Sequence, residues 1–145
     1  MRLIVQTVSY ATCTVDEKSV GSIENGYMVL VGLGQDDDEE KVVKMAKKLS
    51  KLRVFEDHEG KMNLDIKAVN GSILSISQFT LYADTNKGNR PSFVNAMGGE
   101  KAELLYQYFN ECLRNEGLTV EEGVFGAHML IDLCNVGPKT FILEV

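Results

Sequence analysis

Two short stretches of this sequence carry residue types that could do chemistry. Ser77, Gln78 and Thr80 place three polar side chains directly after the apolar run Ile73–Ile76, where a buried strand is expected to end. Backbone N–H groups at such a strand end can point at one common position, and the Thr80 hydroxyl is a potential nucleophile. No side chain beside Thr80 in the sequence could act as its base, so we expect the segment to position a reacting group rather than bond to it.

The second stretch is Asn135–Thr140, which contains Gly137 and Pro138 between the apolar runs Met129–Cys134 and Phe141–Val145. Glycine adopts backbone angles that other residues avoid, and proline fixes its own φ and donates no hydrogen bond. A cis bond before proline costs only about 0.5–1 kcal/mol. On turn statistics alone the segment is a connection between two strands. The alternative is a rigid corner that presents its carbonyl groups in a fixed direction.

The elements that would position these stretches can be predicted from the spacing of apolar residues. Spacing of i, i+3 and i+4 predicts a first helix from Val42 to Leu52, preceded by the acidic run Asp36–Asp38, which suits the positive end of a helix dipole. A second helix is predicted from Gly99 to Gly117, with Gly117 as its C-terminal cap. Strands are predicted at 3–8, 12–15, 20–23, 27–31, 73–76, 129–134 and 141–145. We expect an α+β fold in which a curved, largely antiparallel, barrel-like sheet packs against two main helices.

The composition predicts one domain, residues 1–145. A chain of this length with 44% hydrophobic and 25% charged residues can build a hydrophobic core without disulfide bonds or structural metals. The longest apolar run, Tyr27–Leu33, is too short to cross a bilayer, and the N-terminus lacks a long apolar segment or cleavage pattern. We therefore expect a cytoplasmic protein without a membrane partner. Cys13, Cys112 and Cys134 are an odd set without a CxxC pair, so no disulfide framework or zinc cluster is predicted and each is expected to be buried.

Taken together, Ser77-Gln78-Phe79-Thr80-Leu81 and Asn135-x-Gly137-Pro138-x-Thr140 resemble the two signature motifs of the D-aminoacyl-tRNA deacylases. The chain length, the Met1 start, Arg90-Pro91-Ser92-Phe93 and Phe125-Gly126-Ala127-His128-Met129 fit the same family, so the resemblance covers the whole chain. It implies an enzyme that hydrolyses the ester bond of D-aminoacyl-tRNA and releases free tRNA and the D-amino acid. Glycyl-tRNA is an expected second substrate, and neither a cofactor nor a metal is implied.

The resemblance also implies a role for each motif. Ser77, Gln78, Phe79 and Thr80 would hold the oxyanion and position the substrate, and Phe125, Gly126, Ala127, His128, Met129 and Arg90 would bind the end of the tRNA. Gly137 and Pro138, joined by a cis bond, would reach from one subunit of a homodimer into the pocket of its twin. Their carbonyl groups would exclude an L side chain and admit a D side chain or glycine. Such composite sites require a two-fold homodimer, and the motif gives Lys139 no role.

The net charge of −6 argues against a protein that wraps a tRNA body, since proteins that coat nucleic acid are usually basic. We expect a small footprint on the acceptor end. Lys44, Lys47, Lys48 and Lys51 form one side of the first predicted helix, as a solvated face or a weak contact with the tRNA backbone. Two other functions stay open: a Cys- or Ser-dependent hydrolase of small esters, and a non-catalytic module that holds the end of a tRNA.

Overall fold

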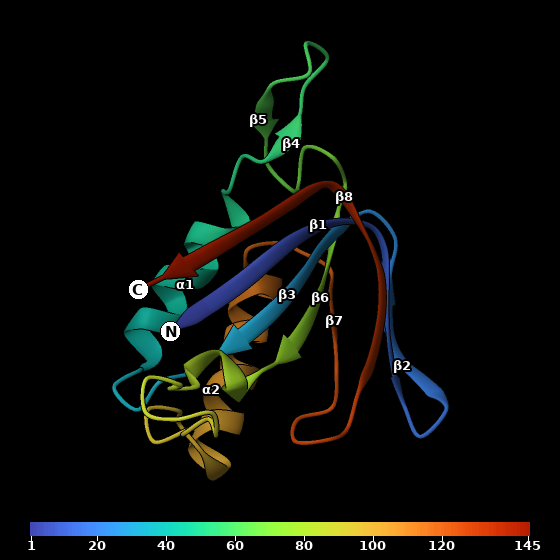
Figure 1. Cartoon of the computed structure of the whole chain (residues 1–145). Coiled ribbons are helices and arrows are strands. Elements are labelled where there is room, and N and C mark those ends of the chain that lie inside the picture. The colour runs from blue at the N-terminus through green and yellow to red at the C-terminus, as the bar shows by residue number, and fades with distance from the viewer.

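A long N-terminal strand organises the sheet. In the computed structural model, which describes residues 1–145, β1 (Arg2–Val15) pairs along one edge with β8 (Leu130–Glu144). Its other edge pairs first with β3 (Gly26–Gly32) and then with β2 (Lys18–Ile23). All three pairings are antiparallel, and β1 and β8 bend together, which gives the sheet its curvature (Figure 1).

The other half of the sheet is parallel. β6 (Ser72–Ser77) runs parallel to β3, and β7 (Val120–Glu122) runs parallel to β6. The α+β class and the curved sheet are confirmed, but the detail "largely antiparallel" needs this correction. The physical reason is that a helix lies between each of these pairs in the sequence, and a helical crossover returns the next strand in the same direction.

The two crossover helices are α1 (Glu39–Ser50) and α2 (Gly99–Asn115), which lie side by side against one face of the sheet (Figure 1). They close the larger of two hydrophobic clusters, which includes Leu49 of α1 and Phe109 of α2. A smaller cluster lies on the opposite face of the sheet, where the beginning of β8 packs its Ile131 and Leu133 side chains against it. Neither helix is long and apolar enough to span a bilayer.

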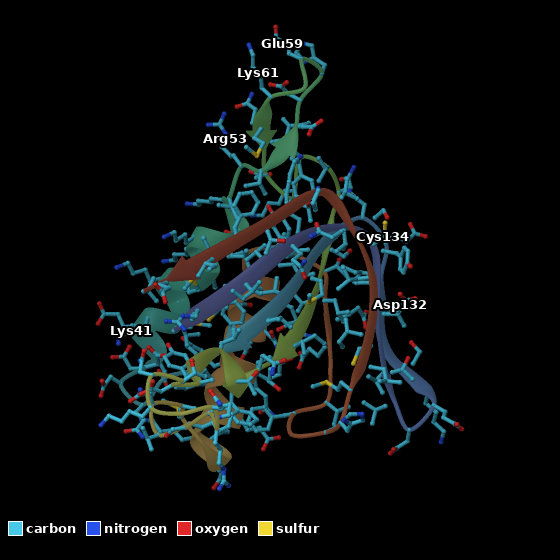
Figure 2. All side chains as sticks on the ribbon, viewed as in Figure 1. Lys41, Arg53, Glu59, Lys61, Asp132 and Cys134 are labelled. Atoms are coloured by element: carbon cyan, nitrogen blue, oxygen red, sulfur yellow. The ribbon has the colours of Figure 1, made fainter.

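The predicted signal at one end of each helix is confirmed, although α1 begins three residues before Val42 and ends two residues before Leu52. Asp38 is the N-cap of α1, and its carboxylate accepts a hydrogen bond from the Lys41 N–H at 2.9 Å. Gly117 follows the end of α2 with a φ of +84°, the left-handed conformation that terminates helices. The prediction for the cysteines is only partly right, because Cys13 is buried, Cys112 is half-buried and Cys134 is exposed on β8 (Figure 2).

Removing the α1 cap should lower stability by a small, measurable amount. For Asp38→Ala we expect the free energy of unfolding to fall by about 1 kcal/mol, because an N–H of the first turn loses its acceptor. Urea denaturation followed by circular dichroism measures this. Asp36→Ala is the matched control, since the Asp36 side chain is exposed and makes no hydrogen bond. Equal losses in the two variants would contradict the capping role.

The Gly-Pro segment is not the hairpin turn that sequence statistics favour. The two apolar runs beside it form one strand, β8, and both pair with β1. Thr140 pairs with Gln6 and Asn135 with Val8, so the four residues Val136–Lys139 bulge out between them. We call these four residues the corner. The Gly137–Pro138 peptide bond within it is cis.

A small two-stranded arm projects from the body beside this end of the sheet (Figure 1). It consists of β4 (Phe55–Glu56) and β5 (Met62–Leu64), which pair antiparallel. A loop with Gly60 at its turn joins them. The remaining element is η1 (Phe79–Tyr82), a short 3-10 turn that directly follows β6.

Candidate active site

A cavity of about 310 Å³ lies at the carboxyl end of β6. Of the 15 residues that line it, 11 are hydrophobic, which suits a flat apolar group held by a few polar contacts. The lining combines Ser77, Gln78 and Phe79 with the run Phe125–Met129. Two predicted groups of site residues, separated by more than 40 positions in the sequence, therefore share one pocket.

Only some of the backbone N–H groups at the end of β6 are free to bind a substrate. The Gln78 N–H donates to the Val31 carbonyl of β3 at 2.8 Å, so it is already occupied. η1 begins at Phe79, and the first N–H groups of a helical turn have no acceptor within that turn. The amide groups of Phe79 and Thr80 are therefore the candidates for binding an oxyanion, which narrows the predicted set of four residues.

The hydrogen-bond partner of the Thr80 side chain is an amide and not a base. Its side chain is exposed, and its hydroxyl accepts a hydrogen bond from the Gln78 side-chain amide. An amide donor cannot take a proton from the hydroxyl, so this contact does not activate Thr80 as a nucleophile.

η1 itself is held from two sides. The Arg2 guanidinium donates to the Leu81 carbonyl at 2.6 Å and lies 5.2 Å from the centre of the Tyr82 ring. On the other side, the Phe93 ring meets the Phe79 ring edge-on with centroids 4.9 Å apart. The loop that contains Arg90 is thus attached to η1 through Phe93. Arg90 itself is exposed and does not line the pocket.

The far wall of the pocket is tied to β6 through one carbonyl group. The Ser75 carbonyl accepts the Tyr106 hydroxyl at 2.8 Å and the Gly123 N–H at 3.0 Å. Tyr106 lines the pocket and packs against Phe125, with ring centroids 6.0 Å apart. Burial raises the pKa of Tyr106, which keeps its hydroxyl a neutral donor.

Sequence reasoning did not assign seven of the lining residues to the site. Three of them belong to strands of the sheet, Leu33 directly follows β3, and the other three are Met97, Ala102 and Tyr106. Ala102 and Tyr106 are one turn apart on α2, so they face the same way. That spacing was the available signal, but it is also the spacing of core residues. No group of three or more His, Cys, Asp or Glu side chains in the molecule is arranged to hold a metal ion.

The corner does not line this pocket. At the base of the corner Asn135 pairs with Val8, Val8 pairs with Gly26 of β3, and Gly26 pairs with Ser72 of β6. The pocket lies at Ser77, five residues further along β6, or roughly 17 Å of extended chain. Within one chain the corner and the pocket therefore lie at opposite ends of the sheet.

Comparison with known proteins identifies the family of this chain. Residues 4–144 match the family model described as D-Tyr-tRNA(Tyr) deacylase. The chain belongs to this family. A D-aminoacyl-tRNA deacylase from Lactobacillus delbrueckii subsp. bulgaricus is 52% identical over 145 residues and covers all of both chains. Another from Thermotoga petrophila is 51% identical over 144 residues, 99% of this chain and 97% of the relative.

Two solved structures have the same fold as this chain. The structure named c-Myc DNA Unwinding Element Binding Protein superposes with a TM-score of 0.93 at 38% identity and covers 100% of this chain and 99% of its own. A structure described as a probable eukaryotic D-amino acid tRNA deacylase has a TM-score of 0.86 and 17% identity, covering 99% and 98% of the two chains. At that identity, the second structure shows the fold alone.

Proposed function

We propose that this protein hydrolyses the ester bond of D-aminoacyl-tRNA, with the end of the tRNA in the pocket beyond β6. The observation that carries this proposal is the meeting of Phe79 with the run Phe125–Met129 in one largely apolar cavity of a chain that belongs to the deacylase family. The terminal adenosine would occupy the apolar part, where Phe125 can stack on a base. A pocket of this size would hold only the acceptor end of the tRNA. Such a small footprint does not require the basic surface of a protein that coats nucleic acid, so it is compatible with the net charge of −6. The cytoplasm is the compartment in which such a substrate is found.

The chemistry needs little beyond placement. An aminoacyl ester is already activated, so its hydrolysis requires a positioned water or the 2′-OH of the substrate ribose, together with donors for the oxyanion. The amide groups of Phe79 and Thr80 would supply those donors. Ser77 and the Gln78 side chain would orient the ester, the latter through its contact with the Thr80 hydroxyl.

The selection of D over L substrates would come from the corner of a second subunit. In its own chain the corner lies at the opposite end of the sheet from the pocket, so Gly137 and Pro138 can contact the substrate only if another copy presents them. We infer a two-fold homodimer with two composite sites, in which the carbonyl groups of these residues would meet an L side chain and exclude it. Glycine has no side chain to exclude, so glycyl-tRNA would also be hydrolysed.

The experiment that tests this proposal compares D-Tyr-tRNA, L-Tyr-tRNA and Gly-tRNA with catalytic amounts of protein. We expect turnover of the D and glycyl substrates and none of the L substrate above background. Stoichiometric binding without turnover would show a tRNA-end module instead. Hydrolysis of simple free esters with no activity on D-Tyr-tRNA would show a small-ester hydrolase.

The Thr80 side chain should contribute to the rate without being required for it. For Thr80→Ala we expect kcat on D-Tyr-tRNA to fall about tenfold, because the Gln78 side chain loses its partner while the backbone amide remains. Steady-state hydrolysis at saturating substrate measures this, and Thr85→Ala in the adjacent exposed loop is the control. Complete loss of activity, or an acyl group trapped on Thr80, would instead identify a covalent nucleophile.

A further inference from the structure

One charged residue of the corner makes a contact that the proposed function does not use. The Lys139 ammonium donates to a Glu56 carboxylate oxygen at 2.8 Å. Glu56 belongs to β4, so this ion pair joins the corner to the arm. The Lys139 side chain is only 19% exposed, although Val136, Gly137 and Pro138 beside it are exposed.

The aliphatic part of Lys139 lies against Gly137. A Cβ atom built on Gly137 would come within 2.7 Å of Lys139 Cγ and within 3.0 Å of the Lys139 backbone nitrogen. The side chain of Lys139 therefore runs from the glycine of the corner to the carboxylate of Glu56. A displacement of this side chain would be transmitted directly to the glycine.

The other hydrogen bonds of the corner hold its first and last residues, Val136 and Lys139. The Thr7 hydroxyl donates to the Val136 carbonyl at 2.8 Å, and the Lys139 N–H donates to the Asn135 side chain at 3.2 Å. These contacts stay within the β1–β8 pair. The Lys139–Glu56 ion pair is the one that reaches a third strand.

A cavity behind the corner leaves few other contacts, besides the Lys139–Glu56 ion pair, to fix the position of the corner. A cavity of about 360 Å³ lies between β1, β4 and the corner, and its lining includes Val8, Phe55, Val136 and Lys139. The corner is therefore not packed against a continuous core on this side. Its position depends on the side chains that tether it.

We propose that the Lys139–Glu56 ion pair is a specificity-determining brace that fixes the direction of the carbonyl groups of Gly137 and Pro138. The inference rests on the proposed function, in which those carbonyl groups reject L substrates. Lys139 and Glu56 are positioning residues: they touch the corner and the arm and not the substrate. Because the Glu56 side chain is 56% exposed, the pair is a weak one, and its loss should change discrimination about two- to fivefold.

The test measures kcat and KM for D-Tyr-tRNA and L-Tyr-tRNA in Lys139→Met and Glu56→Gln. Methionine keeps an aliphatic chain against Gly137 and removes the charge. We expect kcat/KM for the D substrate to stay within about twofold and kcat/KM for the L substrate to rise about two- to fivefold. The exchanged variant Lys139→Glu/Glu56→Lys should recover part of the wild-type ratio, which a purely local packing defect would not allow.

Lys61→Met is the matched control. Lys61 pairs with Glu59 on the same arm at 3.1 Å, and both side chains lie at the tip of the arm, away from the sheet (Figure 2). The ratio of its kcat/KM values for D-Tyr-tRNA and L-Tyr-tRNA should equal that of the wild type. Thermal unfolding of each variant shows whether the fold is kept.

If Lys139→Met and Glu56→Gln both keep the wild-type ratio of kcat/KM for D-Tyr-tRNA to kcat/KM for L-Tyr-tRNA, the ion pair does not act as a brace. The proposed function would be unaffected by that result. Failure of the exchanged variant to recover any discrimination would overturn the role of the ion pair itself. A wild-type protein that hydrolyses both enantiomers equally would overturn the proposed function, a result distinct from either of these.

Discussion

Replacement of Gly137 with alanine is expected to reduce the preference for D-Tyr-tRNA over L-Tyr-tRNA about tenfold to a hundredfold. Gly137 has a φ of +118°, a conformation that side-chain-bearing residues rarely adopt. Its added Cβ would also lie 3.0 Å from the backbone nitrogen of Lys139, so the backbone of the corner must move. A displacement of about 1 Å is enough to lose this much selectivity, because discrimination depends on where two carbonyl groups point.

The measurement is the ratio of kcat/KM values for D-Tyr-tRNA and L-Tyr-tRNA. An unchanged kcat/KM for the D substrate shows that the pocket itself is intact. Gly60→Ala is the control, since Gly60 also has a positive φ, +75°, but no atom within 4 Å of the added Cβ. It carries the same kind of backbone strain at the tip of the arm without changing the corner. An unchanged D-to-L ratio in Gly137→Ala would refute the proposed gatekeeping by the corner.

The parts of the fold that sequence reasoning predicted are those specified by local physics. The first helix could be located because its apolar residues repeat every three or four positions and Asp38 supplies a cap before them. The strand before Ser77 could be located because an apolar run of the right length ends in polar residues. In both cases the signal lies within a few neighbouring residues.

The parts that sequence reasoning missed depend on which strand pairs with which. A Gly-Pro pair is compatible with a hairpin turn or with a bulge, and only the pairing of both halves of β8 with β1 decides between them. The direction of β6 relative to β3 also has no local signal, because an apolar run has the same composition in either orientation. The helix α1 between the two strands was the usable evidence, since a crossover of this length favours a parallel pair.

The site was predictable where its residues are unusual for their position and unpredictable where they are ordinary. The polar residues at the end of β6 and directly after it are informative because the central residues of that strand are all buried. Tyr106 was missed because a tyrosine on the apolar side of a helix is typical of a core. Arg90 was assigned to the tRNA end from its motif, yet it is exposed outside the pocket, so that assignment remains a prediction.

The composite site predicts a result that no single chain could give. A variant with a blocked pocket, Ala127→Trp, should be inactive on both enantiomers, because Ala127 lines the cavity that a tryptophan would fill. The Gly137→Ala variant should hydrolyse both. When the two are refolded together with a tenfold excess of Ala127→Trp, almost every open pocket should face an intact corner. We therefore expect hydrolysis of L-Tyr-tRNA per Gly137→Ala chain to fall about tenfold, while hydrolysis of D-Tyr-tRNA per chain is kept.

The control for this experiment is an excess of the double variant Ala127→Trp/Gly137→Ala, which offers a blocked pocket and a defective corner. It should leave the hydrolysis of L-Tyr-tRNA unchanged, because the open pockets still meet an altered glycine. If the single and double variants had the same effect, selectivity would have to arise within one chain. That outcome would conflict with the register of the sheet, which places the corner five residues of β6 away from the pocket of its own chain.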